Sequence, residues 1–238
     1  NANVVYLFER DSSTPLWNYA AGDEVWTVSV SSDGQYITAG SDDDNVYVFY
    51  NEIEEESELP WSYETGSSVV SSAISADGET IAAASWDGKV YLFDKDSSTP
   101  LWSYETGGSV QWVDISADGK YIIVGKTSNN NIYLFDKDSN TPLWTYSAGD
   151  AVYSVAISAD GEYIAVGSSD GKVYLFDKDS STPLWSYTSD NIYTVSISAD
   201  GELLVAGSYD KKVYVFNKDS STPLWNYTSG DKIYSVSI

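Results

Sequence analysis

Short stretches of alternating or fully apolar residues, separated by polar turns, run along the whole chain. In the segment 151–187, residues 152–157 alternate between apolar and small or polar side chains, and residues 163–167 are apolar on both faces. Two further apolar stretches follow at 173–176 and 184–187. Alternation with a period of two is typical of half-buried strands, and a continuous apolar run of this length is typical of a fully buried strand. The pattern therefore predicts four short strands in this segment and no helix.

Asp-Gly turns separate the first three of these predicted strands. Asp160-Gly161 lies between the first and second, and Asp170-Gly171 lies between the second and third. Glycine at such a turn supplies the positive φ that tight hairpins require. The turns therefore predict that consecutive strands pair antiparallel.

The same unit recurs along the chain. All six Phe residues end the motif aromatic–aliphatic–Phe, at spacings between 40 and 44 residues, and all six Pro residues stand one or two positions before a Trp. The phenylalanines are Phe8, Phe49, Phe93, Phe135, Phe176 and Phe216. The tryptophans are Trp17, Trp61, Trp102, Trp144, Trp185 and Trp225. Four short strands per unit of this length are typical of a β-propeller blade.

We therefore expect an all-β fold, a β-propeller of about six four-stranded blades, with residues 1–238 forming one domain. The first strand of each unit is expected innermost and the Trp-bearing strand outermost. Proline suits an outer edge strand, because a missing N–H costs little there and discourages edge-to-edge aggregation. The six tryptophans are expected to serve the structural repeat at the rim of the ring.

The chain ends suggest how the ring closes. The chain begins with a third and an outermost strand, Val4–Phe8 and Leu16–Tyr19, and it ends with an innermost strand, Ile233–Ile238. We expect these pieces to form one closing blade that lacks its second strand, in a fragment of a longer polypeptide. Part of a seven-bladed ring is the alternative.

The pattern from Ser158 to Asp177 resembles the WD-repeat family, with Phe176-Asp177 in the place of the Trp-Asp dipeptide. The histidine that usually precedes the innermost strand in that family is missing from every unit, so the hydrogen-bond network built on it is not expected here. The resemblance implies a propeller whose role is protein interaction or assembly.

The spacing of Asp and Trp also resembles the tryptophan-docking motif of quinoprotein-like propellers, in which an Asp precedes a Trp by eight residues. This spacing occurs in the pairs Asp94/Trp102, Asp136/Trp144 and Asp177/Trp185, and in Asn217/Trp225 with an amide. Members that are enzymes need a cation-bound cofactor and a carboxylate base. The two resemblances together cover the chain, and one superfold hosts many functions.

Composition narrows the function classes. The chain has no His and no Cys, which removes the usual proton shuttle and the thiolate nucleophile. Its net charge of −24 disfavours binding to phosphate backbones, so no nucleic-acid partner is expected. No apolar run is long enough to insert into a membrane as a helix. A strongly acidic surface suggests an extracellular or cell-surface protein, although solvation alone would explain it.

Aromatic residues occupy the second position of four of the six innermost strands, with Val70 and Gln111 in the other two, and we expect this position to surround one mouth of the channel. The third unit breaks the repeat most, with Gln111, Trp112, Asp114 and the insertion 126–131. Exposed aromatic clusters are frequent interaction anchors. The candidate binding residues are Trp26, Gln111, Trp112, Asp114, Tyr153, Tyr193 and Tyr234. Ordinary packing between blades is the alternative role for these side chains.

Acidic residues outside these positions support weaker hypotheses. Asp136, Asp138 and Asn140 place oxygen ligands at alternate positions, as in a calcium loop, but the glycine and glutamate of such loops are absent, and a capped turn is the alternative. The acidic runs 42–44 and 52–58 are solvated loops or docking sites for a basic partner. No catalytic residue and no cofactor is predicted, apart from the calcium hypothesis.

These observations favour a non-catalytic propeller scaffold for protein interaction or self-assembly, outside the cell or at its surface. The alternatives are a propeller that binds a sugar or a cation, and a quinoprotein-like enzyme.

Overall fold

The computed structural model describes residues 3–51 and 58–238, and within these ranges every regular element is a β-strand. Five antiparallel four-stranded sheets and one two-stranded sheet follow one another along the chain. The N-terminal sheet contains β1 (Val4–Phe8) and β2 (Pro15–Ala20). The all-β propeller prediction is confirmed. The described residues contain no helix suited to crossing a membrane.

We number the four-stranded sheets as blades 1 to 5. Blade 1 contains β3 (Val25–Val30), β4 (Tyr36–Ser41), β5 (Asn45–Tyr50) and β6 (Glu58–Glu64). Blade 2 contains β7 (Val69–Ile74), β8 (Thr80–Ser85), β9 (Lys89–Asp94) and β10 (Trp102–Glu105). Blade 3 contains β11 (Trp112–Ile115), β12 (Tyr121–Gly125), β13 (Asn131–Asp136) and β14 (Trp144–Ser147). Blade 4 contains β15 (Val152–Ile157), β16 (Tyr163–Ser168), β17 (Lys172–Asp177) and β18 (Trp185–Thr188). Blade 5 contains β19 (Ile192–Ile197), β20 (Leu203–Ser208), β21 (Lys212–Asn217) and β22 (Trp225–Thr228).

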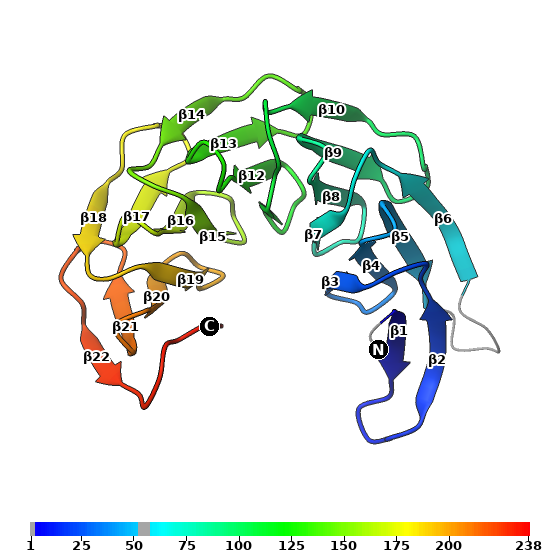
Figure 1. Cartoon of the computed structure of the whole chain (residues 1–238), viewed down its shortest axis with the longest axis horizontal. Helices are drawn as coiled ribbons and strands as arrows, with labels where there is room; N and C mark the ends of the chain where they lie inside the picture. Colours follow the sequence, from blue (N-terminus) through cyan, green and yellow to red (C-terminus); the bar gives the residue numbers. More distant parts are fainter. Residues whose placement is uncertain (1–2, 52–57) are drawn as a thin grey trace.

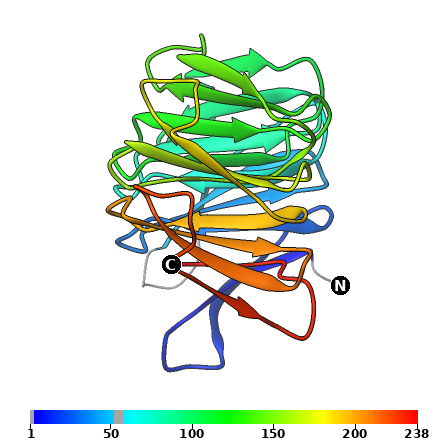
Figure 2. The ribbon, with the colours of Figure 1, turned by 90° about the vertical axis from the view of Figure 1, so that its left-hand side faces the viewer.

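The blades stand side by side along an arc (Figure 1), with the first strand of each blade on the concave side and the Trp-bearing strand on the convex side. Viewed from its side, the arc is a stack of twisted sheets packed face to face (Figure 2). Within each blade the strands pair in chain order. The predicted strand order and the rim position of the tryptophans are therefore confirmed.

Buried side chains fill the space between blades. In β16, residues 164–168 are all buried, as the continuous apolar run predicts for a second strand covered on both faces. Gly167 lies at a close approach of two blades, because a Cβ atom there would lie 2.8 Å from a methyl carbon of Ile192 in the next blade. Small residues on one blade thus accommodate large residues on the next.

The rim tryptophans dock onto the following blade. The Trp185 indole lies against Phe216, and its Nε1 donates a hydrogen bond to the carbonyl oxygen of Lys218 at 2.7 Å. The same bond, at 2.7 Å, runs from Trp61, Trp102 and Trp144 to a lysine carbonyl of the following blade. The buried Nε1 of Trp17 has no hydrogen-bond partner among the described residues. Each blade is therefore tied at its rim to the next one along the chain.

The expected closing blade is not formed. The N-terminal sheet lies at one end of the arc, and residues 233–238 lie at the other end, against blade 5 (Figure 1). The Ile233 amide donates to the Ser208 carbonyl at 3.2 Å, but the segment has no strand partner and is not assigned as a strand. Neighbouring strands must lie about 4.8 Å apart to pair, so without a second strand nothing joins this segment to β1.

Candidate binding surface

Four tyrosines gather at the inner end of blades 4 and 5. The rings of Tyr153 and Tyr193 stack with centroids 5.5 Å apart, and Tyr234 lies 5.2 Å from Tyr193 on its other side. Tyr209 joins them at 6.0 Å from Tyr193, and the Lys232 ammonium lies 3.8 Å from the centre of the Tyr209 ring. We call these four tyrosines and Lys232 the tyrosine cluster. Three of its members are residues that the sequence predicts to lie together.

A second aromatic patch lies on blades 1 and 2. The rings of Trp26 and Trp86 are 6.4 Å apart, and the two side chains are 53% and 44% exposed. Aromatic groups of this size are normally buried, so a pair left in solvent is a candidate contact surface. We call this pair the tryptophan pair.

Sequence reasoning missed Trp86 and Tyr209, although a signal for both exists. They occupy the same repeat position, directly before the aspartate of the second turn, at Asp87 and Asp210. Other units carry Asp42 or Ser169 there, as solvent-exposed turns normally do. An aromatic residue in a polar turn position was therefore the available signal.

The irregular third unit does not join either aromatic group. The side-chain oxygen of Gln111 accepts the Thr127 amide at 3.1 Å, and Trp112 Nε1 donates to the Val152 carbonyl at 3.1 Å. The Gln111 side chain therefore makes a contact within blade 3, and the Trp112 side chain makes a contact with blade 4. The ring of candidate residues is divided into two patches.

Asp114 links blade 3 to blade 4. Its Oδ2 accepts the Ile157 amide at 3.0 Å, and its Oδ1 accepts the Ile115 amide at 2.9 Å. Burial raises the pKa of this carboxyl to about 6, and the two amide bonds act in the opposite direction. In blade 4 the Ser154 hydroxyl makes a similar link between blades, because it accepts the Val195 amide of blade 5 at 3.1 Å. Asp114 is therefore a positioning residue between blades.

Lys126 is a second break in the repeat, and its side chain is completely buried. Its Nζ donates to the Thr106 carbonyl at 2.8 Å. Serine occupies this position in the other blades, for example Ser168, whose hydroxyl donates to the Asp150 carbonyl at 3.0 Å. Burial lowers the pKa of the Lys126 ammonium, and Glu105 partly opposes that effect. Lys126 and Ser168 thus each tie a strand to the loop that precedes its blade.

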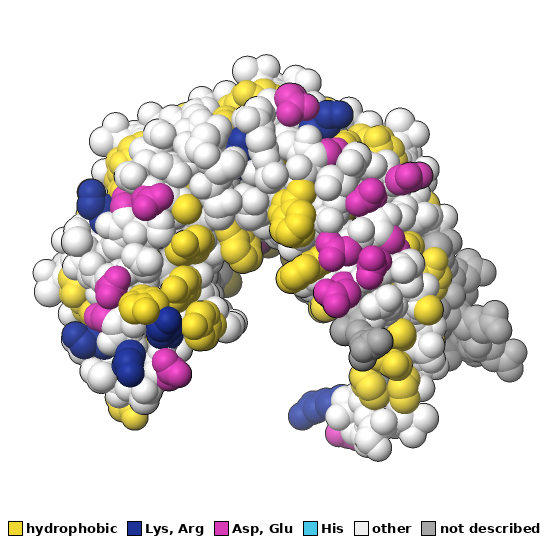
Figure 3. Space-filling model, in the orientation of Figure 1, with side chains coloured by type: hydrophobic (Ala, Val, Ile, Leu, Met, Phe, Trp, Pro, Cys, Tyr) yellow, Lys and Arg dark blue, Asp and Glu magenta, His cyan; other side chains and the backbone are white. Residues whose placement is uncertain are grey.

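Acidic side chains lie on the face of the arc seen in Figure 3, mostly over one arm, beside hydrophobic side chains along the inner edge. Some of these carboxylates are structural. In the run 42–44, Asp43 Oδ2 accepts the Tyr47 hydroxyl and the Gly22 amide, each at 2.6 Å. Burial acts to raise the pKa of Asp43, but these hydrogen bonds outweigh it and hold the pKa below its usual value. The run 52–58 lies outside the described residues except for Glu58.

The calcium hypothesis at Asp136, Asp138 and Asn140 stays a prediction. Asp136 Oδ1 accepts the Asp138 amide at 2.9 Å, which is the geometry of a capped turn. In the part of the chain that the structure describes, no three His, Cys, Asp or Glu side chains converge as metal ligands would.

The arc of four-stranded blades and the docked tryptophans define a β-propeller, and its repeats are similar to WD-type and quinoprotein-like repeats. Comparison with known families gives the same result. Residues 128–237 match the family described as outer membrane protein assembly factor BamB, and residues 13–49 and 59–94 match the WD domain, G-beta repeat. The resemblance seen in the sequence is therefore confirmed. No curated protein sequence matches the chain.

Proposed function

We propose that this propeller is a non-catalytic scaffold that binds a partner protein through the tyrosine cluster and the tryptophan pair. The observation that carries the proposal is the exposure of Trp26, on the inner strand β3, and of Trp86, in the turn after β8, with their rings 6.4 Å apart. Tryptophan and tyrosine are the residues most enriched at the energetic centres of interfaces. WD repeats, which this chain contains, commonly mediate protein interaction.

The chemistry of the surface favours a basic partner segment. The chain carries 36 acidic and 12 basic residues, so its long-range field attracts cations. The tyrosine cluster already holds one ammonium group, Lys232 over Tyr209 at 3.8 Å. A lysine or arginine of a partner would find the same cation–π contact on neighbouring rings.

The breaks in the repeat do not favour catalysis. Asp114 is engaged by two backbone amides, and Lys126 donates to a backbone carbonyl. A catalytic acid or base needs a partner that places it against a substrate. We also propose an extracellular or cell-surface location, which the acidic composition supports.

The test uses three fluorescent peptides of equal length, one rich in lysine and arginine, one neutral and one acidic. We expect the purified chain to bind the basic peptide, with an affinity that falls as salt rises. The double variant Trp26→Ser/Trp86→Ser and the variant Tyr193→Ser should each weaken binding about 10-fold. The matched control is Trp225→Ser, because Trp225 is an exposed tryptophan on the convex rim.

Equal weakening by the Trp225 control would contradict the proposed surface. Binding of a neutral oligosaccharide that Tyr193→Ser abolishes, with no binding of the basic peptide, would support the sugar-binding alternative instead.

A further inference from the structure

Lys232 lies over the Tyr209 ring, with its ammonium 3.8 Å from the ring centre. A cation this close to the face of an aromatic ring makes a cation–π contact. Interaction with the Tyr209 side chain also raises the pKa of the Lys232 ammonium above its ordinary value, so the contact favours the charged form. The Tyr209 ring is therefore already occupied by a cation of the same chain.

The repeat places Lys232 at this ring. The next residue, Ile233, donates its amide to the Ser208 carbonyl of blade 5 at 3.2 Å. The same bond occurs inside the arc, where the Val152 amide of blade 4 donates to the Lys126 carbonyl of blade 3 at 3.1 Å. Lys232 is therefore held by a contact that also forms between complete blades.

Other units carry no cation at the position of Lys232. The residue directly before the inner strand is Glu24, Ser68, Ser109, Ala151 and Asn191 in blades 1 to 5. At the tryptophan pair, Trp86 corresponds to Tyr209, and Ser109 corresponds to Lys232. The Ser109 hydroxyl donates to the Trp86 backbone carbonyl at 3.2 Å, and the Trp86 side chain is 44% exposed. No lysine or arginine of the described residues lies over the ring of Trp26 or Trp86.

The two aromatic groups also differ in the charge beside them. The exposed Glu24 stands two residues before Trp26, whereas Lys232 stands two residues before Tyr234, at the same repeat position. A carboxylate attracts an approaching ammonium or guanidinium group, and an ammonium repels it. The tryptophan pair is therefore open to a cation, and the Tyr209 ring is filled.

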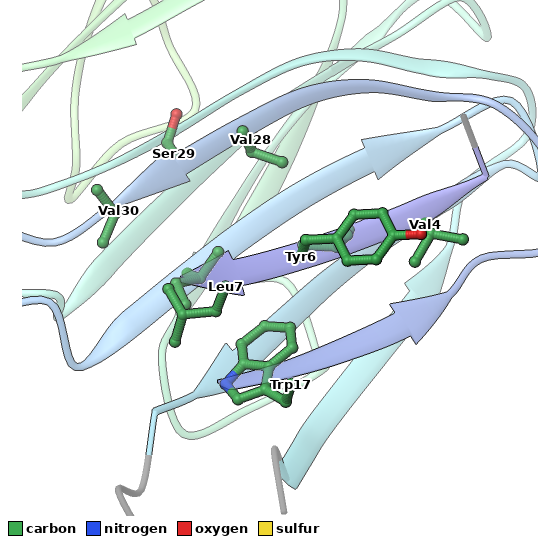
Figure 4. A pocket seen from close by; sticks show the side chains of 9 residues that line it. Val4, Tyr6, Leu7, Trp17, Val28, Ser29 and Val30 are labelled. Carbon is green, nitrogen blue, oxygen red and sulfur yellow. The ribbon is translucent and has the colours of Figure 1, made fainter. Parts of the chain in front are cut away.

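The apolar groove between β1 and β3 does not compete for such a cation. It has a volume of about 400 Å³, and Val28 is 59% exposed on its wall (Figure 4). Among the described residues, no charged side chain lines it. Since a buried cation needs a counter-charge or hydrogen-bond acceptors, the groove is a poor site for lysine or arginine.

We propose that Lys232 closes the Tyr209 ring to the cationic side chains of a partner, so that the tryptophan pair receives them first. The inference rests on the proposed function, because it assigns the partner's lysine or arginine to one of the two aromatic groups. Tyr153 and Tyr193 keep their role as apolar contacts. Lys232 thus limits the affinity of the tyrosine cluster for a basic partner.

The first measurement is the affinity of the lysine- and arginine-rich peptide, followed by fluorescence anisotropy at one salt concentration. Lys232→Gln opens the Tyr209 ring, so the affinity should rise about 2- to 5-fold, the range expected for one exposed cation–π contact. Adding Tyr209→Ser to Lys232→Gln should remove this gain, because the opened ring is then absent.

Lys211→Gln is the matched control for charge. It removes one positive charge from the same end of blade 5, where the Lys211 Nζ donates to the Gly230 carbonyl at 3.3 Å. A general increase in negative charge would raise the affinity equally in Lys211→Gln and Lys232→Gln. We expect the larger gain in Lys232→Gln.

The second measurement needs no peptide. Lysines of the purified chain are methylated with ¹³C-labelled formaldehyde, which preserves their charge, and the methyl signals are recorded by NMR. The Lys232 signal is identified by its loss in Lys232→Gln. Ring current should shift it upfield in the parent chain, and Tyr209→Ser should remove the shift.

These outcomes separate the inference from the proposed function. An unshifted Lys232 signal, or equal gains in Lys232→Gln and Lys211→Gln, would overturn the inference while peptide binding by the parent chain upholds the proposed function. Binding by Lys232→Gln but not by the parent chain would support the inference and contradict the proposed function. Absence of binding in both would overturn the two together.

Discussion

The indole of Trp185 and the phenyl ring of Phe216 lie 5.3 Å apart across the junction of blades 4 and 5. They come from different blades, yet they belong to the two sequence motifs that define the repeat. The same pairing occurs at each earlier junction, at centroid distances of 5.2 to 5.4 Å: Trp17–Phe49, Trp61–Phe93, Trp102–Phe135 and Trp144–Phe176. Trp225, on the last blade, has no such partner among the described residues and is 54% exposed.

This contrast predicts different effects for the same substitution. Trp185→Phe removes a hydrogen bond to the Lys218 carbonyl and part of the buried ring, so it should lower the free energy of unfolding by about 1–3 kcal/mol. Trp225→Phe removes neither, and it should change stability by less than about 0.5 kcal/mol. Urea unfolding followed by circular dichroism measures both. Equal losses in the two variants would contradict the docking role.

Asp114 predicts a pH-dependent stability. Burial raises the pKa of its carboxyl in the folded state from 3.8 to about 6, so between these values the folded chain binds more protons than the unfolded chain. Its contribution to stability is therefore fully present below about pH 4 and is lost as the pH rises through 6. Asp114→Ser keeps an acceptor for the Ile157 amide, as Ser196 accepts the Ile238 amide at 3.3 Å in blade 5, but has no charge.

At pH 7 the Asp114→Ser variant should therefore be more stable than the parent chain by up to about 3 kcal/mol, and at pH 4 the two should be nearly equal. The measurement is urea unfolding at a series of pH values. Every other carboxylate is common to both proteins, so the difference reports Asp114. A difference that does not change with pH would rule out this explanation.

The buried Lys126 predicts the opposite pH trend. Burial lowers the pKa of its ammonium below 10.5 in the folded state, so folding is disfavoured while the group is charged, and stability is gained as the pH rises through the folded-state pKa. Lys126→Met keeps the apolar stem without the charge. The stability difference, variant minus parent, should decrease between pH 7 and pH 10. A constant difference in thermal unfolding over this range would contradict the prediction.

The hydrogen bond between Tyr174 and Asp170 should make a measurable contribution to the free energy of unfolding. The Tyr174 hydroxyl donates to Asp170 Oδ2, which also accepts the Gly149 amide at 2.9 Å. Tyr174→Phe should lower the free energy of unfolding by about 1.5–3 kcal/mol, because a charged acceptor loses a partner. Tyr146→Phe is the matched control, since its hydroxyl donates no hydrogen bond to any of the described residues. Equal effects in denaturant unfolding would contradict this role for the pair.

The sequence by itself determined the order of the strands and their grouping into four-stranded blades. Turn residues such as Asp160-Gly161 and the period of two act locally, and each hairpin joins neighbours in the chain, so Phe176 and Trp185 could be assigned to adjacent strands without coordinates. The equivalence of units also predicted that Tyr153, Tyr193 and Tyr234 occupy the same position, and the structure brings these three together.

Contacts between blades were decided only by the tertiary structure. Residues that meet there are about 40 positions apart, and their meeting depends on how one twisted sheet rotates against the next. This is why the amide partner of Asp114, the place of Tyr209 beside Tyr193, and the exposure of Val28 could not be obtained from the pattern. The open arc has the same cause: pairing in a sheet acts only between adjacent strands, so the missing second strand leaves β1 and residues 233–238 without a connection.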